Sequence, residues 1–111
     1  MANLTPKLLY IGADTGANVY TVSSNTGSYA IIKNMNICNV TGSTATCNVH
    51  VLVSGVSAAA NNNAILKSFT VAPNETVAYN GIVVLPASSN LYISQAAESI
   101  TFSISGVEYA T

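Results

Sequence analysis

Two cysteines and one histidine are the residues of this chain that could bind a metal ion or act as nucleophile and base. Cys38, Cys47 and His50 lie close together in the 111-residue sequence. A structural zinc site needs about four ligands from Cys, His or acidic side chains, so these three residues alone would not complete one. A disulfide between the cysteines is the other candidate, and disulfides are rare in proteins of the cytoplasm. Both uses depend on how the strands that carry these residues pair.

The acidic residues form no catalytic pair in the sequence. Asp14 and Glu75 lie in or beside expected turns. Glu98 and Glu108 lie near the last expected strand. General acid–base chemistry needs titratable groups that converge on one bond, and His50 has no acidic residue near it in sequence. The glycines form no phosphate-binding loop followed by a helix. We therefore expect no enzymatic activity and no cofactor.

Charged residues make up only 6% of the chain, against about 25% in an average soluble protein. There is no arginine, and the three lysines, Lys7, Lys33 and Lys67, are far apart in sequence. Because phosphate binding relies on clusters of basic residues, we expect no nucleic-acid partner. No apolar run approaches the roughly 20 residues that span a bilayer, so we expect no membrane partner. Residues 1–6 lack the features of a signal peptide, which predicts synthesis and retention in a cytoplasm.

Short β-rich runs alternate with turn residues from one end of the chain to the other, and helical periodicity is absent. This spacing is typical of a sandwich or barrel. We predict an all-β fold: one antiparallel β-sandwich domain over residues 1–111, jelly-roll or immunoglobulin-like, with about eight strands and with residues 1–6 as an extended N-terminal arm. The expected strands are residues 7–11, 18–22, 29–40, 45–53, 64–71, 76–79, 82–85, 91–94 and 99–109.

The alternation of apolar and polar residues predicts which side chains form the core. Residues 29–40 and 45–53 are expected to form a hairpin that pairs Ile37 with Val49 and Met35 with Val51, because this register brings apolar residues together. In the last strand, Ile100, Phe102 and Ile104 alternate with polar residues. The predicted core contains Ile37, Val49, Val51, Phe102 and Ile104.

The same register separates the candidate metal ligands. Cys38 and His50 would point away from the core, and Cys47 would point into it. This arrangement disfavours both the zinc site and the disulfide. We therefore expect two reduced cysteines that act as small packing residues, and a histidine on the surface or in an interface.

Some predicted strands are apolar on both faces. Ile31 and Ile32 are adjacent and must point in opposite directions, and residues 51–53 and 82–85 have no polar face. Because a sandwich strand normally buries only one face, this pattern predicts a surface covered by another subunit. Alternatively, the loop 56–63 overlies the sheet centres. The predicted interface residues are Tyr29, Ile32, Leu52, Val83 and Val84.

The six tyrosines allow two uses. Tyrosines are common at interfaces and on strand surfaces, and this packing role is the one we favour. Aromatic platforms also bind sugars, so a carbohydrate partner is the alternative. The residues are Tyr10, Tyr20, Tyr29, Tyr79, Tyr92 and Tyr109.

Several segments resemble small virion proteins of tailed bacteriophages. They are VYTV (19–22), YAIIKNMNICN (29–39), TCNVHVLV (46–53), APNET (72–76) and ISGVE (104–108). The resemblance covers most of the chain. It implies a non-enzymatic β-sandwich subunit of the phage virion, synthesised in the host bacterial cytoplasm, with no catalytic residues to assign.

The resemblance also implies which partners the chain has. Similar proteins act as capsid decoration or cement subunits, or as components of the tail, baseplate or neck. The implied partners are further copies of the chain and other phage virion proteins, such as the major capsid protein. We favour a location on the head, with a carbohydrate-binding module on the virion surface as the alternative.

Overall fold

The computed structural model describes residues 3–56 and 58–110, and strands dominate this part of the chain. The single short helix among these residues is the 3-10 turn η1 (Asn61–Asn63). No helix in the described ranges has the length and apolar character needed to cross a membrane. The strands are β1 (Asn3–Gly12), β2 (Gly16–Thr21), β3 (Tyr29–Asn39), β4 (Ala45–Leu52), β5 (Ala64–Val71), β6 (Thr76–Tyr79), β7 (Val83–Pro86), β8 (Asn90–Gln95) and β9 (Ile100–Ala110).

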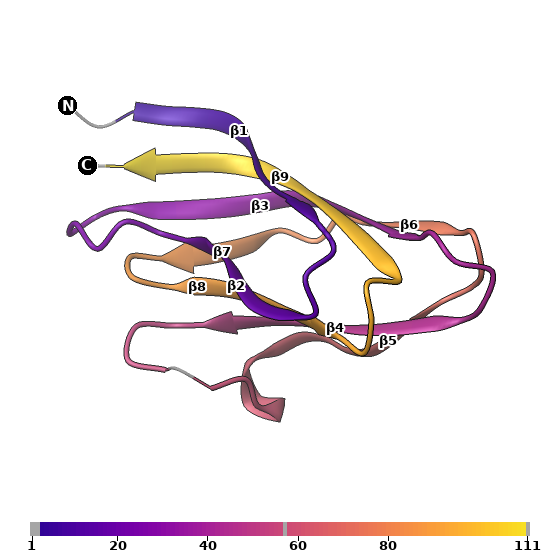
Figure 1. The fold of residues 1–111 in the computed structure, drawn as a ribbon. Helices are drawn as coiled ribbons and strands as arrows, with labels where there is room; N and C mark the ends of the chain where they lie inside the picture. The colour runs from indigo at the N-terminus through magenta and orange to yellow at the C-terminus, as the bar shows by residue number, and fades with distance from the viewer. Residues whose placement is uncertain (1–2, 57, 111) are drawn as a thin grey trace.

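The strands form two antiparallel sheets, which confirms the predicted β-sandwich. The five-stranded sheet has the order β1-β9-β3-β6, with β7 also paired to β3, and the four-stranded sheet has the order β2-β8-β4-β5 (Figure 1). If β6 and β7 are taken as one interrupted strand, the pairs β1–β9, β2–β8, β3–β6/β7 and β4–β5 are nested inside one another. This wound-up double hairpin is a jelly roll, which decides between the two predicted sandwich types.

The predicted hairpin between residues 29–40 and 45–53 is wrong. β3 belongs to the five-stranded sheet and β4 to the four-stranded sheet, so the chain crosses between the layers at residues 40–44. The buried side chain of Asn39 holds this crossing. Its amide nitrogen donates to the Ser43 carbonyl at 2.7 Å and to the Val71 carbonyl at 3.1 Å, and its oxygen accepts from the Thr41 backbone at 2.9 Å. The Thr41 hydroxyl also donates to this oxygen at 2.7 Å, so the buried amide is fully hydrogen-bonded and stabilises the crossing.

The core lies between the two sheets, and its residues are those that alternation predicts. Ile37, Val49, Phe102 and Ile104 are fully buried, and Val51 is half-buried against their cluster. Full burial of such a side chain contributes about 1.5–3 kcal/mol. Periodicity therefore predicted the core correctly although the pairing of β3 with β4 was wrong.

A bulge in β3 reverses which side chains face the core. Ile32 pairs with Gly106 of β9 and Asn34 with Ser105, so Lys33 is an extra residue without a partner on β9. Because each residue in a strand alternates in direction, the extra residue shifts the pattern by one. Ile32 therefore lies in the core and Ile31 on the outer face. The prediction that Ile32 belongs to an interface is wrong for this reason.

The bulge depends on a glycine in the neighbouring strand. A Cβ atom at Gly106 would lie 2.0 Å from the backbone oxygen of Ile31, closer than real atoms approach. Glycine at this position therefore permits the close approach of β9 to β3.

The N-terminal segment is a strand along most of its described length. β1 pairs with β9 from Asn3 opposite Ala110 onward, so residues 3–6 do not form the predicted extended arm. Residues 1 and 2 lie outside the described part of the chain. The 11-residue β9 supplies a partner along this whole segment, and Pro6 is tolerated because β1 lies at the edge of the sheet.

Candidate functional site

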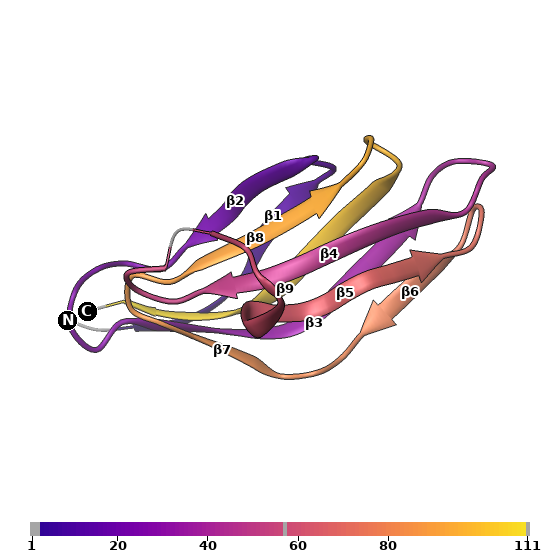
Figure 2. The same ribbon diagram turned by 90° about the horizontal axis from the view of Figure 1, so that it is seen from below.

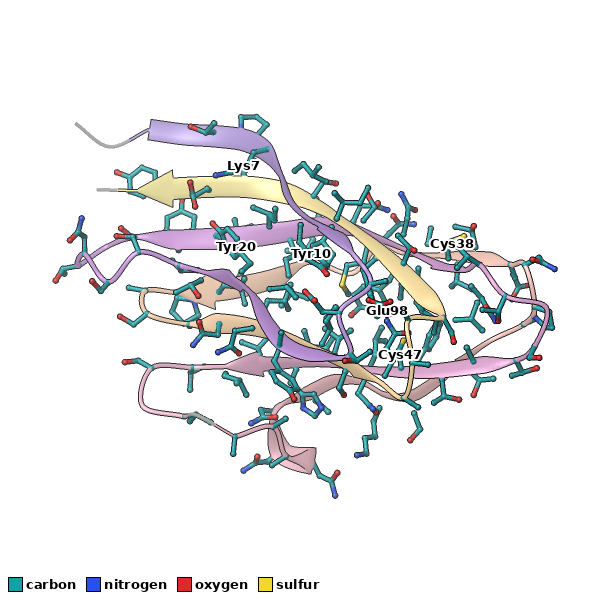
Figure 3. All side chains as sticks on the ribbon, in the orientation of Figure 1. Lys7, Tyr10, Tyr20, Cys38, Cys47 and Glu98 are labelled. Carbon is teal, nitrogen blue, oxygen red and sulfur yellow. The ribbon has the colours of Figure 1, made fainter. Side chains whose placement is uncertain are left out.

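The structure separates the residues that could bind a metal or act in catalysis. Cys38 lies on β3 and Cys47 on β4, in different sheets, and neither is part of a disulfide (Figure 3). His50 is on β4 but on the opposite face from Cys47. Among the described residues, no group of three or more His, Cys, Asp or Glu side chains could hold a metal ion.

The two cysteines differ in burial as their positions on the strands predict. Cys38 is half-buried, whereas Cys47 is fully buried in the core. Burial raises the pKa of the Cys47 thiol to about 11. Because the thiolate is the reactive form, Cys47 is a poor nucleophile and metal ligand near neutral pH.

His50 lies beneath the chain's own loop and not on the surface, so that prediction is wrong. Its side chain is only 4% exposed. Nδ1 lies 2.8 Å from the side-chain oxygen of Asn63, and the ring meets Tyr92 edge-on at 6.0 Å. An amide oxygen can only accept, so Nδ1 carries the proton in this bond.

Asn63 fastens the loop that covers this face of β4. Its oxygen also accepts from the Ala60 backbone nitrogen at 2.9 Å, and its nitrogen donates to the Ala58 carbonyl at 3.1 Å. The short helix η1, which Asn63 ends, lies beside β4 at the start of β5 (Figure 2).

Leu52 follows the same pattern as His50. It lies two residues further along the same face of β4, is 1% exposed, and is outside the central core cluster. The expectation that Leu52 forms an uncovered interface is therefore wrong. At His50, the alternative of a loop that overlies the sheet describes the structure, because Asn63 hydrogen-bonds to the ring.

A hollow of about 580 Å³ opens between the end of β4 and this loop. Its lining consists of Val51, Val53, Val56, Ala58, Ala60, Ala64 and the side chains of Asn62 and Asn63. None of these lining residues is titratable or nucleophilic. The described residues around the hollow therefore offer apolar contact and amide hydrogen bonds, but no catalytic group.

The outer face of the five-stranded sheet is different, because it carries apolar side chains that no segment of the described chain is seen to cross (Figures 1 and 2). Ile31 of β3 pairs with Val84 of β7 on one side and with Val107 of β9 on the other. In the next row, the rings of Tyr29 and Tyr109 stack with centroids 5.0 Å apart and planes at 19°. Cross-strand partners share a face, so these side chains form one surface.

Two members of this surface are strongly exposed. Val84 is 58% exposed, and Leu8, on the neighbouring edge strand β1, is 53% exposed. We call the surface formed by Leu8, Tyr29, Ile31, Val84, Val107 and Tyr109 the outer patch. The patch includes no charged residue, and Lys33 of the β3 bulge is an exposed charge at its border.

The outer patch occupies only one half of the sheet. Further along the same face, Asn36 pairs with Ser103, and Asn34 donates a hydrogen bond to Asn80 at 2.6 Å. These positions are polar and exposed or half-exposed. On the edge strand β1, however, Ile11 pairs with Ser103 and is 62% exposed, so apolar exposure on this face also reaches beyond the outer patch.

A charged network lies behind the outer patch and joins the two sheets. Lys7 of β1 lies 3.2 Å from Glu108 of β9, and the hydroxyl of Tyr20 on β2 donates to the same carboxylate (Figure 3). The hydrogen bond from Tyr20, together with Lys7, lowers the pKa of Glu108 although partial burial opposes this. Burial, followed by the bond to Glu108, raises the pKa of Tyr20. The network therefore links the two sheets at this end of the sandwich.

The five predicted interface residues fall into three groups. Tyr29 and Val84 lie on the outer patch. Val83 packs against the core, and Ile32 is within it. Leu52 is buried outside the central core cluster. Alternation alone did not identify Ile31, Val107, Tyr109 and Leu8, and the signal that could have identified Ile31 is the charged Lys33 directly after the adjacent pair Ile31 and Ile32.

Comparison with known proteins gives one weak structural neighbour. The chain is similar in structure to a chain from the Gx strain of infectious bursal disease virus, with a TM-score of 0.50 and 10% sequence identity. The match covers 98% of this chain and 31% of that chain, so this chain spans about a third of the other's length. At this identity the likeness shows a shared fold. No protein-family model matches the sequence, and no curated protein matches it.

Proposed function

We propose that this chain is a non-enzymatic structural subunit of a virus particle. The observation that carries the proposal is the outer patch, an apolar surface of the jelly roll on which Val84 and Leu8 stay more than half exposed. Bare patches of this kind mark sites of association with other proteins. Jelly rolls recur in viral capsid domains, and the shared fold with a chain of infectious bursal disease virus supports the viral class.

The reactive residues support a structural function. Cys47 is in the core, and His50 is hydrogen-bonded to Asn63. Glu108 forms an ion pair with Lys7 and accepts a hydrogen bond from Tyr20. Each of these groups packs in the core or forms a polar contact that stabilises the fold. An enzyme needs a nucleophile, a base and an orienting group that meet in one pocket.

The narrower form of the proposal is a capsid decoration or cement subunit of a tailed phage, made in the host bacterial cytoplasm and bound to the major capsid protein. The resemblance of residues 29–39 and 46–53 to phage virion proteins supports this form. A tail, baseplate or neck component is the neighbouring alternative. Neither form needs nucleic acid or a membrane as partner.

A sugar-binding function has less support, because five of the six tyrosines contact other groups of the fold, including the two on the outer patch, whose rings stack on each other. Tyr29 and Tyr109 stack on each other, and Tyr20 is bonded to Glu108. Tyr92 contacts His50, and the ring of Tyr10 lies over Gly12. A sugar platform needs an aromatic face that is open to the ligand.

Quantitative mass spectrometry of purified virus particles tests the proposal. We expect the chain in a fixed, multiple-copy ratio to the major capsid protein through successive purification steps, while an abundant host cytosolic protein is lost. A chain that is abundant in the lysate but absent from the particles would contradict the proposal. Adding the purified chain to separated capsids and tails distinguishes the narrower forms, because saturable binding to capsids alone supports decoration.

A further inference from the structure

We propose that Asn80 is a site of covalent modification, at which the folded chain spontaneously loses a side-chain amide and gains a carboxylate. The inference goes beyond the proposed function and does not depend on it, because the reaction needs only the chain and water. Asn80 is the only asparagine of the sequence that directly precedes a glycine. Three features favour the reaction: the following glycine, the break between two strands, and the exposure of the side chain to solvent.

The reaction is an intramolecular displacement. The backbone nitrogen of Gly81 attacks Cγ of Asn80 and closes a succinimide ring, while the side-chain amide group takes up the proton of that nitrogen and leaves as ammonia. A water molecule then opens the ring at either of its carbonyl carbons. The products are aspartate, with the original backbone, and isoaspartate, whose backbone runs through Cγ. In both products OH replaces NH2, and the resulting carboxyl group is ionised near neutral pH.

The residue after an asparagine controls access to the attacking nitrogen. A side chain at that position obstructs the approach of the nitrogen to Cγ, and glycine has none. The fold also favours glycine here, since a Cβ atom at Gly81 would lie 2.5 Å from the hydroxyl oxygen of Tyr79 and 2.6 Å from the ring carbon that bears it. The packing of Tyr79 therefore favours the same small residue that the reaction needs.

The backbone around Asn80 lies outside the strand pairing that would oppose ring closure. β6 ends at Tyr79 and β7 begins at Val83, so residues 80–82 belong to no strand. Ring closure changes the backbone dihedral angles, and isoaspartate lengthens the backbone. Both changes are least costly where no hydrogen bond between paired strands must break.

The side chain of Asn80 is exposed, and its oxygen accepts a hydrogen bond from the amide nitrogen of Asn34 at 2.6 Å. This is its one side-chain hydrogen bond to the described residues, so none of them holds the nitrogen that must leave. Asn39 and Asn63 differ, because the oxygen and the nitrogen of each side chain are both hydrogen-bonded. We therefore expect the reaction at Asn80 before these positions.

The folded chain accommodates the product. A carboxylate can only accept hydrogen bonds, and Asn34 already donates one, so the same contact becomes charge-assisted when the amide is replaced. The formal net charge of −1 becomes more negative by one unit. The new charge lies next to Asn34, on the polar half of the face that carries the outer patch.

Incubation of the purified full chain at mildly alkaline pH under native conditions, followed by peptide mapping, tests the inference. Mass spectrometry detects each event as a gain of about 1 Da, the difference between OH and NH2. Asn62 and Asn74 are internal controls, because both are exposed and precede residues with side chains. We expect modification of Asn80 to be at least about tenfold faster than modification of either control. Fragmentation that distinguishes isoaspartate from aspartate should detect both products at Asn80.

Chromatography of variants gives a second measurement. On ion exchange, Asn80→Ser should remove the acidic form that accumulates with time, whereas the matched control Asn62→Ser should leave it unchanged. Asn80→Asp reproduces one of the products. We expect its thermal unfolding midpoint to stay within about 3 °C of the wild-type value, because the site is exposed.

The opposite results would overturn the inference. If Asn80 stays intact, or is modified no faster than Asn62 and Asn74, the site has no special reactivity. Modification of Asn80 in urea but not under native conditions would show that the fold prevents ring closure. An acidic form that persists in Asn80→Ser arises at another residue. A much lower unfolding midpoint of Asn80→Asp would show that the fold does not accommodate the product.

Discussion

The outer faces of the two sheets differ in how far their side chains are buried by the rest of the chain. On the four-stranded sheet, His50 and Leu52 are buried on the outer side of β4, where Asn63 fastens the loop over His50. On the five-stranded sheet, Val84 and Leu8 remain more than half exposed. The chain therefore buries His50 and Leu52 on one outer face and leaves Val84 and Leu8 exposed on the other, and the proposed assembly surface rests on this contrast.

The bulge that creates the outer patch gives the largest predicted effect. Gly106→Ala would place a methyl group 2.0 Å from the Ile31 oxygen. We expect a loss of at least about 3 kcal/mol of unfolding free energy, or failure to fold, because backbone must move to relieve the clash. Gly42→Ala is the control, since nothing lies within 4 Å of its added carbon. Urea unfolding of both variants checks this, and a stable Gly106→Ala variant would show that the close approach is wrong.

The position of the loop over His50 on the four-stranded sheet should depend on Asn63. Asn63→Ala removes the partner of the buried His50 ring and two bonds within the loop. We expect a loss of about 1–3 kcal/mol, the usual range when a buried polar group loses its partner. Faster proteolysis of the 53–63 loop should accompany the loss.

The neighbouring exposed residue provides the control for Asn63. Asn62→Ala alters the same loop without touching His50, and we expect a change below about 0.5 kcal/mol. Equal effects of the two substitutions on unfolding and proteolysis would mean that Asn63 does not hold the loop against His50.

A smaller effect is expected at low pH from the network behind the outer patch. The folded state lowers the pKa of Glu108 below its ordinary value of 4.5, so the folded state releases the proton more readily than the unfolded state. This contribution is fully present above about pH 4.5 and is lost as the pH falls through the lower folded value.

Stability measured against pH in the wild type and in Glu108→Gln checks this contribution. We expect the difference between them to shrink below pH 4.5, and its size at neutral pH to be at most about 1 kcal/mol because the pair is partly exposed. A difference that grows as the pH falls would contradict the assignment.

The smallest effect on stability is expected from labelling of the two thiols. Brief labelling of the native protein should not unfold it. Cys38 is half-buried, and Cys47 is in the core with a raised pKa of about 11. In a brief alkylation without reductant, mass spectrometry should show one modified cysteine, Cys38. After denaturation it should show two. A disulfide-linked pair, or faster modification of Cys47, would contradict the strand assignment.

The sequence predicted the features that depend on local periodicity. The strand positions, the sandwich class and the burial of Ile37, Phe102 and Ile104 follow from alternation, which needs no knowledge of pairing partners. The same alternation placed Cys47 in the core, although the hairpin from which we inferred it does not exist. Jelly-roll pairing joins strands far apart in sequence, so local patterns contain little information about it.

The candidate surface was only partly predictable, because two long-range effects decide it. One extra residue at Lys33 exchanges the faces of Ile31 and Ile32, and the bulge requires Gly106 on a distant strand. Leu52 is buried on the outer side of β4, which strand alternation alone does not predict. Tyr29 and Val84 were predicted as interface residues and lie on the uncovered face, and their binding function stays a prediction.

The most direct test of the central claim compares the two faces in one experiment. Hydroxyl-radical footprinting would be applied to the chain in purified particles and to the dilute free chain. We predict that oxidation of Tyr29 and Tyr109 on the outer patch falls several-fold in the particle, while oxidation of Tyr92 on the four-stranded sheet is unchanged. Unchanged labelling of Tyr29 and Tyr109, or protection confined to Tyr92, would contradict the claim that the uncovered face is the one that assembles.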